Sequence, residues 1–199
     1  MDKSKILGHF AIFTAYTIFG FNIITCKNLV SFGIISPMGI FCLRAIGATI
    51  CFWLLSLFLP KEKVDLKDLP KIFLASMLGL FLTQISFLKA MTITTPVDAS
   101  IMTSLTPIFT MFIAAFFLKE PITLKKAGGV AISFFGVILL ILNSVHASNG
   151  VEHSHPMGLF LMMCNCLFFA LYLGAFKPLV QKYGTVTFMK WMFLFSAIA

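Results

Sequence analysis

Hydrophobic residues run through this chain in long blocks that short polar segments separate. A helix needs about 20 mainly apolar residues to cross the hydrocarbon core of a bilayer, and several blocks reach that length. We therefore predict an all-α polytopic membrane protein with seven transmembrane helices. The predicted spans are residues 6–26, 34–59, 71–91, 97–118, 126–143, 157–176 and 185–199. The last block has no polar stop, so we expect a truncated sequence.

Composition supports lipid as the solvent for most of this chain. Hydrophobic residues make up 59% of it and charged residues only 11%, with a mean hydropathy of +1.00. Soluble domains carry about 25% charged residues, so these few charges cannot cover a soluble surface. The net charge of +8 would suggest nucleic acid only if the bases formed a patch. They lie between the apolar blocks instead, so we predict membrane lipid and no nucleic acid as a partner.

The lysines predict an orientation. With the N-terminus in the cytoplasm, eleven lysines fall inside and two, Lys27 and Lys89, fall outside, as the positive-inside rule requires. The inside lysines are Lys3, Lys5, Lys61, Lys63, Lys67, Lys71, Lys119, Lys125, Lys126, Lys177 and Lys182. We expect an integral protein of a bacterial cytoplasmic (inner) membrane with its N-terminus inside.

Polar side chains within the apolar blocks are the candidates for a functional site. Such groups must find partners in lipid, so they face protein or a water-filled cavity. Small residues recur at i, i+4, i+7 and i+11 in the fourth block, on one helix face: Ala99, Thr103, Thr106 and Thr110. This face is either a packing seam or one wall of a solute path. Arg44 either faces a cavity or snorkels to the outer interface. The candidate substrate-path residues are Thr14, Asn22, Arg44, Gln84, Thr103, Thr106, Thr110 and Tyr172.

Four further residues are predicted to have structural roles. Pro107 lies in mid-helix and frees a backbone carbonyl. Glu120 is expected to cap the next helix or to pair with a nearby lysine. Gly129 and Gly136 share a small face with Ser133, which would let a neighbouring helix pack closely.

Metal, cofactor and enzyme chemistry find little support in the sequence. The loop 143–156 contains four ligand-type residues: His146, Glu152, His153 and His155. The loop is short and polar, and nothing orients these side chains, so we favour a solvated linker over a metal site. No paired carboxylates or nucleophile motif lie at membrane depth. We therefore predict no catalytic residue, no metal and no cofactor.

Several short motifs follow one another in a distinctive order. They are Phe19-Gly20-x-Asn22-x4-Lys27, Pro37-x6-Arg44 and the series Ala90, Ala99, Pro107, Glu120, Gly129 and Gly136. This order resembles the first half of EamA-type transporters of the drug/metabolite transporter (DMT) superfamily. The resemblance implies ten helices in two five-helix repeats of opposite orientation, with a solute cavity between them. We expect residues 1–145 to form the first repeat, 146–156 an outer loop and 157–199 the first two helices of an inverted second repeat.

The same resemblance implies a secondary transporter that moves small metabolites or drugs by alternating access. Proton-coupled carriers commonly place acids or histidines along the pathway, and none lies in mid-membrane here, so we predict facilitated or exchange transport. Lys27, Arg44 and Lys89 favour an anionic or zwitterionic solute. The alternatives are a non-transporting membrane scaffold or an inactive truncated fragment. A homo-oligomer, in which a second copy completes the cavity, also stays open.

Overall fold

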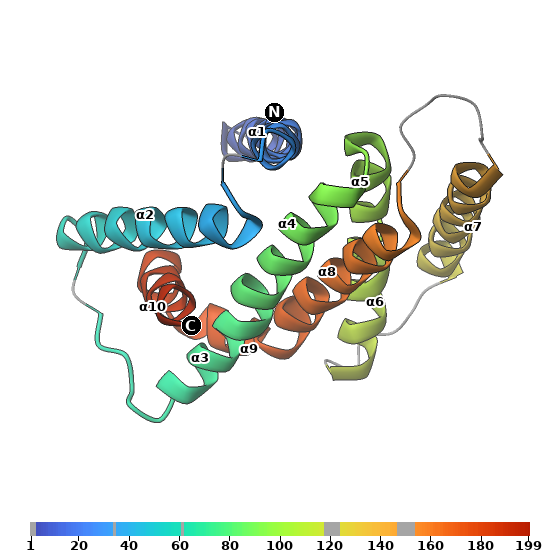
Figure 1. Cartoon of the computed structure of the whole chain (residues 1–199). Coiled ribbons are helices and arrows are strands. Elements are labelled where there is room, and N and C mark those ends of the chain that lie inside the picture. Colours follow the sequence, from blue (N-terminus) through green and yellow to red (C-terminus); the bar gives the residue numbers. More distant parts are fainter. Residues whose placement is uncertain (1–2, 34, 61, 118–123, 147–153) are drawn as a thin grey trace.

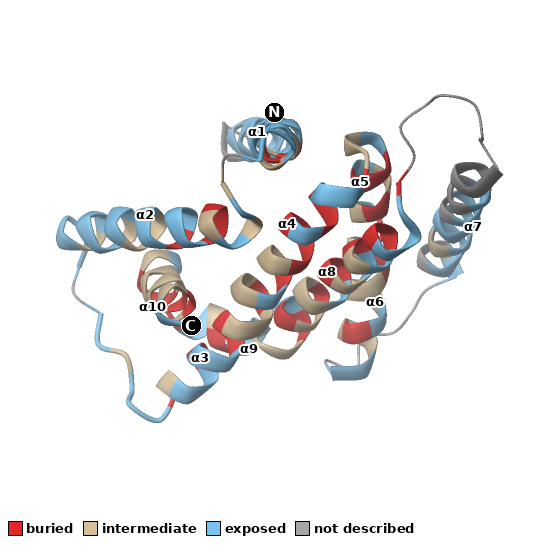
Figure 2. Ribbon diagram, viewed as in Figure 1, coloured by how far each residue is buried: buried red, intermediate tan, exposed pale blue. Residues whose placement is uncertain are grey.

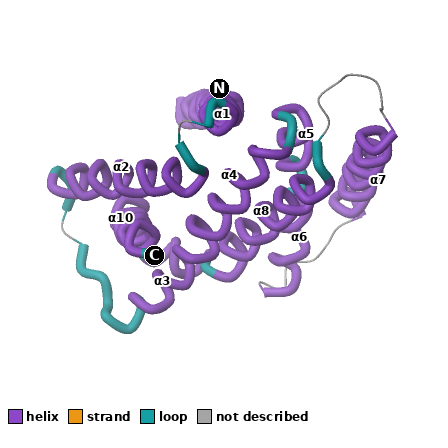
Figure 3. Tube along the Cα trace, viewed as in Figure 1, coloured by secondary structure: helices purple, strands orange, loops and turns teal. Residues whose placement is uncertain are grey.

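The structure is a computed structural model of the chain and describes residues 3–33, 35–60, 62–117, 124–146 and 154–199. Every regular element in these ranges is a helix, which confirms the predicted all-helical class (Figures 1 and 3). The helices are α1 (Lys3–Ser31), α2 (Pro37–Leu57), α3 (Leu69–Ser76), the π-helix η1 (Met77–Leu82), α4 (Thr83–Ile93), α5 (Pro96–Thr103), α6 (Thr106–Phe117), α7 (Leu124–His146), α8 (Pro156–Ala175), α9 (Lys177–Lys182) and α10 (Thr185–Ile198).

The described residues include five helical stretches that are long and apolar enough to cross a membrane. They are Leu7–Ser31, Pro37–Leu57, Leu69–Ile93, Pro96–Phe117 and Pro156–Ala175. The third joins α3, η1 and α4, and the fourth joins α5 and α6. The two remaining predicted spans fall on α7 and α10, whose described apolar segments are the shorter Ala127–Gly136 and Thr185–Ile198. The protein is an integral membrane protein, and its total of seven spans stays a prediction.

Helix α8 lies at the centre of the packing. It contacts α4 and η1 on one side and α5 and α6 on another, and the buried residues concentrate on α4 and α8 (Figure 2). Glycines allow two of these close approaches. A Cβ atom at Gly79 would lie 2.6 Å from the ring of Tyr172, and one at Gly174 would collide with Ile113. A side chain at either position would push the spans apart.

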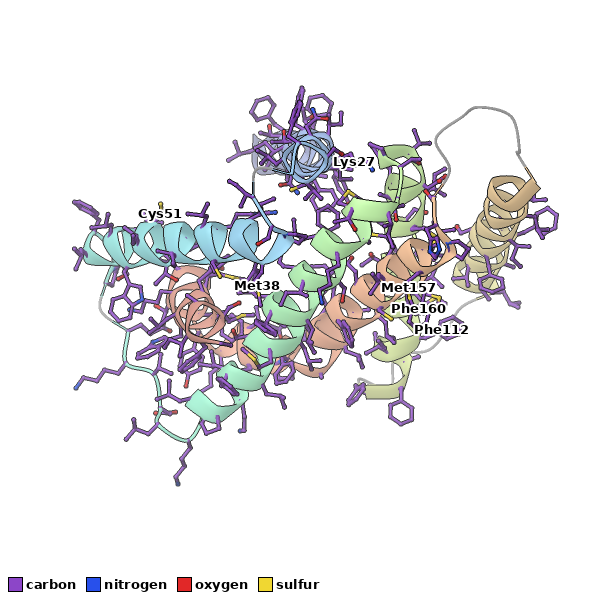
Figure 4. All side chains as sticks on the ribbon, viewed as in Figure 1. Lys27, Met38, Cys51, Phe112, Met157 and Phe160 are labelled. Atoms are coloured by element: carbon purple, nitrogen blue, oxygen red, sulfur yellow. The ribbon has the colours of Figure 1, made fainter. Side chains whose placement is uncertain are left out.

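Helix α1 shows the opposite environment. Its apolar side chains project around the whole helix, and many are exposed, including Phe10 at 66% and Phe13 at 71% (Figure 4). Cys51 lies on the face of α2 that points away from α10. Water would not tolerate apolar surface on this scale, whereas lipid covers it without cost. The exposed apolar faces of α1 and α2 are therefore suited to contact with lipid.

The fourth span is interrupted where its proline occurs. Helix α5 ends at Thr103 and α6 begins at Thr106, one residue before Pro107. Proline has no N–H group and cannot make the bond to the carbonyl four residues earlier. The chain tightens instead, and the N–H groups of Ser104 and Leu105 bond to carbonyls three residues back, at 3.1 Å each. The span thus bends into two short helices that both pack against α8.

Two polar clusters connect segments that are distant in sequence. The charged cluster comprises Glu62, Asp65, Asp68, Lys71, Lys182 and Tyr183, and it joins the start of α3 to the α9–α10 corner. The hydroxyl cluster comprises Ile93, Thr95, Asp98, Ser154 and His155, and it joins the α4–α5 turn to the start of α8. The continuous helix Leu69–Ile93 separates the two clusters by roughly 35 Å, so they mark opposite ends of the bundle.

Candidate functional site

A pocket of about 170 Å³ lies between α2, the third span and α10. These three elements converge to the left of the centre of Figure 1. The lining residues are Phe41, Arg44, Ala45 and Ala48 of α2, Leu80 of η1, Gln84 of α4, and Phe193 and Ser196 of α10. Apolar and aromatic walls with a few polar groups are typical of sites that bind small molecules.

Arg44 supplies the only charge among the lining residues. Its Nη1 donates a hydrogen bond to Sγ of Cys26 on α1 at 3.4 Å, and the Cys26 thiol donates to Oδ1 of Asn22 at 3.6 Å. None of the ion pairs in the described part of the chain includes Arg44. The guanidinium is thus oriented from α1 by neutral groups, and its charge has no carboxylate partner among the described residues.

Gln84 lies two residues beyond the end of the π-helix. A π-helical turn leaves backbone groups out of the regular α-helical pattern and often marks a functional site. Here two bonds satisfy those groups: the Thr83 hydroxyl donates to the Leu78 carbonyl, and the Asn165 amide of α8 donates to the Thr83 carbonyl, both at 2.7 Å. Helix α8 therefore fixes the backbone that carries Gln84 into the pocket wall. The hydrophobic pattern of the third span did not predict this π-helix.

Ser196 is the third polar residue of the lining. It is only 1% exposed, and its hydroxyl has no hydrogen-bond partner in the described part of the protein. A buried hydroxyl without a partner is costly. Ser196 therefore presents an unused donor and acceptor at the pocket.

Two aromatic side chains of the pocket lining pack against aromatic residues outside the lining. Phe193 stacks on Phe52 of α2, with ring centroids 5.3 Å apart, and Phe41 meets the edge of the Phe81 ring at 5.5 Å. Such pairs restrict ring rotation and help to keep the two apolar walls in place. The next contact along α2 and α10 joins two further aromatic side chains, Trp53 and Trp191, at 5.7 Å.

The structure brings together three of the eight predicted substrate-path residues. Arg44 and Gln84 line the pocket, and Asn22 reaches Arg44 through Cys26. Sequence reasoning missed Cys26, which resembles a small hydrophobe, and it missed Ser196. A single serine in an apolar block looks like a packing residue, and no repeated polar spacing singles it out.

The other five substrate-path candidates lie elsewhere. Thr14 is exposed on α1, and Tyr172 is buried against Gly79. The hydroxyl groups of Thr103 and Thr110 donate to carbonyls of their own helices, at 2.8 Å each. Thr106 is partly buried at the start of α6, which packs against α8. The threonine face thus lies beside α8, as a packing seam would, and none of its residues lines the pocket.

The predicted structural residues have mixed surroundings. Pro107 lies at the break in the fourth span, and Glu120 is outside the described residues. Gly129 and Gly136 are exposed, and no described atom lies within 4 Å of a Cβ placed at either glycine. Their face on α7 is open in the structure, so the packing role of these glycines stays a prediction.

The loop 143–156 is only partly described. Glu152 and His153 fall outside the described residues, as does the side chain of His146. His155 caps α8, since its Nδ1 accepts a hydrogen bond from the Met157 N–H group at 3.2 Å. Within the described ranges, no three His, Cys, Asp or Glu side chains are grouped to hold a metal ion.

Comparison with known proteins gives one family and one relative. The EamA-like transporter family matches residues 6–142 of the chain. A protein of Archaeoglobus fulgidus named "Uncharacterized transporter" is 29% identical over 153 residues, which cover 77% of this chain and 52% of that protein. The chain thus spans about half the length of the curated relative it matches. No solved structure matches the chain.

Proposed function

The chain belongs to the EamA-like transporter family, and from this premise we propose that it acts as a secondary transporter of small metabolites or drugs. The observation that carries this proposal is the pocket between α2, the third span and α10. It places Arg44 and Gln84 on two helical stretches that are long enough to cross a membrane, and Ser196 on the shorter apolar helix α10. An ionisable residue at such a position is costly and usually lines a substrate path.

The charge of Arg44 supports an anionic or zwitterionic solute. The guanidinium has neutral neighbours in Cys26 and, through it, Asn22, and it forms no ion pair within the described residues. A negatively charged group of the solute would provide the counter-charge that the described residues do not.

Facilitated diffusion or exchange is the proposed mode of transport. The pocket lining contains no Asp, Glu or His, which are the side chains that usually carry protons through transporters. The solute gradient itself would then drive transport. We expect solute inside vesicles to accelerate uptake of labelled solute, and an imposed pH gradient to leave the uptake rate unchanged.

Alternating access requires that the pocket open to one side at a time. The charged cluster closes one end of the bundle by joining the segment before α3 to the α9–α10 corner. The hydroxyl cluster closes the other end by joining the α4–α5 turn to α8. We propose that these two clusters separate in turn. The charged cluster joins a segment of the predicted first repeat to one of the predicted second repeat, and the hydroxyl cluster joins the first repeat to the end of the predicted outer loop.

Uptake into liposomes tests the proposed function. The purified protein would be reconstituted and supplied with a panel of labelled metabolites and drugs, both anionic and neutral. We expect saturable uptake of anionic solutes, which Arg44→Gln abolishes and Lys67→Gln leaves unchanged, because Lys67 is an exposed lysine outside the pocket. Absence of uptake across the whole panel would favour the membrane scaffold instead.

We propose that the protein lies in a bacterial cytoplasmic (inner) membrane, with its N-terminus in the cytoplasm. In this orientation the segments that carry Asp65 and Lys182 lie on the same side of the membrane. The ion pair between these two residues supports that arrangement. Single cysteines in a cysteine-free background can test the side. A cysteine at Lys63 should resist a membrane-impermeant thiol reagent in intact cells, whereas one at Val97 should react. The reverse labelling would invert the topology.

A further inference from the structure

We infer that the pocket binds a small organic monoanion with a flat apolar body, whose carboxylate pairs with Arg44 while Gln84 and Ser196 supply hydrogen bonds. This inference rests on the proposed function, since it names the class of solute for the same pocket.

The charges of the lining specify a single negative group. Arg44 is the one cation of the lining, and its planar guanidinium matches a carboxylate with two parallel hydrogen bonds. The lining contains no carboxylate that could pair with the ammonium group of a zwitterion. Lys190, the cation of α10, is already engaged, because its Nζ lies 5.2 Å from the ring centroid of Trp53. A dianion would leave its second charge without a partner.

The polar groups of the lining specify acceptors on the same solute. The Ser196 hydroxyl is buried and unpaired within the described residues, so it can donate to a carboxylate oxygen. The side chain of Gln84 offers both an amide donor and a carbonyl acceptor. Its backbone is held in place by the hydrogen bond from Asn165 to the neighbouring Thr83 carbonyl. A ligand that satisfies both groups recovers the cost of burying them, whereas a hydrocarbon of the same shape does not.

The walls and the volume specify the remainder of the solute. Phe41, Leu80 and Phe193, together with two alanines, line the apolar part of the pocket, which favours a ring or a flat chain over a hydrated sugar or phosphate. The volume of about 170 Å³ is well below the roughly 300–1,000 Å³ of pockets that bind drug-sized ligands. A metabolite built on a single ring fits this size class better than a drug does.

The protein contains a reporter for this pocket. Its two tryptophans, Trp53 and Trp191, lie in contact on α2 and α10, the same helices that provide six of the lining residues. Trp191 is two residues from Phe193, and Trp53 follows Phe52, on which Phe193 stacks. A ligand that enters between α2 and α10 should therefore change the intrinsic tryptophan fluorescence at equilibrium, whether or not transport occurs.

The test uses benzoate as the probe, with benzamide as its neutral isostere and acetate as an anion without a ring. The purified protein would be placed in phosphatidylcholine nanodiscs and titrated with each compound while tryptophan fluorescence is recorded. We expect saturable benzoate binding that is at least tenfold tighter than binding of benzamide or acetate. Equal affinities for benzoate and benzamide would overturn the inference.

Variants assign the binding to named side chains. Arg44→Gln should weaken benzoate binding at least tenfold, and Arg44→Lys should restore part of it, which separates loss of charge from misfolding. Ser196→Ala should weaken benzoate binding severalfold, and Lys67→Gln should leave it unchanged, because Lys67 is exposed and lies outside the pocket. Wild-type affinity in Arg44→Gln, or an equal loss in Lys67→Gln, would contradict the assignment.

Two further experiments separate binding of a solute in the pocket from binding of a lipid headgroup, and separate this inference from the proposed transport. An anionic lipid headgroup offers Arg44 the same counter-charge, so the titration would be repeated in nanodiscs that contain phosphatidylglycerol. Unchanged benzoate affinity supports the pocket, whereas competitive loss would assign Arg44 to lipid and overturn the inference. Benzoate binding without uptake in liposomes would contradict the proposed transport only. Uptake of other solutes without benzoate binding would contradict this inference only.

Discussion

The two ends of the bundle join distant segments by different chemistry. In the charged cluster, Lys182 bonds to Asp65 and Asp68 at 2.6 Å each, and the Tyr183 hydroxyl donates to Asp68 at 2.8 Å. In the hydroxyl cluster, the Ser154 hydroxyl donates to Asp98 and accepts from the Thr95 N–H group at 2.9 Å. No cation takes part in the second set of contacts.

This difference indicates how each end can be opened. Ion pairs at a surface weaken with salt and with protonation, so the charged cluster should respond to solution conditions. The hydroxyl cluster depends on buried hydrogen bonds and close packing, since Asp98 and Ser154 are only 9% and 6% exposed. Its contacts should respond to the shape of nearby side chains and little to salt.

The largest effect is expected from a side chain added at Gly158, in the hydroxyl-cluster end of α8. A Cβ atom there would collide with Oγ1 of Thr94 and lie 3.1 Å from the Ile93 carbonyl oxygen. Thr94 is fully buried and has no room to move. We expect Gly158→Val to lower the free energy of unfolding by about 1–3 kcal/mol, as overpacking commonly does. Thermal unfolding in detergent, followed by tryptophan fluorescence, measures this loss.

Gly129→Val is the matched control for that variant. No described atom lies within 4 Å of a Cβ placed at Gly129, so the same side chain meets open space on α7. Its melting temperature should stay close to that of the wild type. An equal loss of stability in both variants would show that valine disfavours these helices in general, and the close contact at α8 would not be the cause.

The next effect comes from the same substitution made at both ends. Asp68→Asn removes the charge that Lys182 and Lys71 pair with, so we expect a clear fall in melting temperature. Asp98→Asn keeps an oxygen that can accept from Ser154, so we expect a much smaller fall. Added salt should narrow the gap between Asp68→Asn and the wild type. A larger loss for Asp98→Asn would reverse the comparison of the two ends.

The helical class, and the placement of two distant segments at the same end of the bundle, followed from patterns that extend along the whole sequence. Apolar blocks predicted membrane-crossing helices, and the lysine distribution put residues 61–71 and 177–182 at one end, where Lys182 and Asp65 now meet. The ion pairs themselves were not predicted. Periodicity reports which helix face is apolar, but it carries no information on which loop lies beside which.

The candidate site was predicted less completely for a related reason. Arg44 and Gln84 stood out because polar groups in apolar blocks are costly, and both line the pocket. The regular threonine spacing around Thr106 was a stronger pattern, yet these residues lie on α5 and α6, which pack against α8, because small residues also suit close helix packing. Ser196 gave no signal, since its role depends on contact between helices that are far apart in sequence.

Acid and alkali should also destabilise the charged-cluster end, with a smaller effect than removal of Asp68. Hydrogen bonds from Lys182, Tyr183 and Lys71 hold the pKa of Asp68 well below its usual range. Because this pKa is lower in the folded state than in the unfolded chain, the stabilisation is complete above about pH 4 and is lost as the pH falls toward the folded pKa. The melting temperature of the wild type should therefore fall below pH 4, and Asp68→Asn should reduce this dependence.

The alkaline side has the opposite sign. Hydrogen bonds to Asp65 and Asp68 raise the pKa of Lys182 above its usual range. Its stabilisation is therefore complete below about pH 10 and is lost as the pH rises through the folded pKa. A Lys182→Met variant should lose this alkaline dependence. An unchanged acid and alkaline profile in both variants would show that the charged cluster does not control stability.

The smallest effect is expected from Lys71, the outer partner of Asp68. Its side chain is 64% exposed, and its Nζ lies 3.2 Å from Asp68, a longer contact than the 2.6 Å of Lys182. Exposed ion pairs contribute little because water and salt screen them. Lys71→Met should leave the melting temperature almost unchanged at physiological salt, whereas Lys182→Met should lower it, because Lys182 joins two segments and Lys71 only one turn of α3. Equal losses in the two variants would mean that net charge, and not the link between segments, stabilises this end.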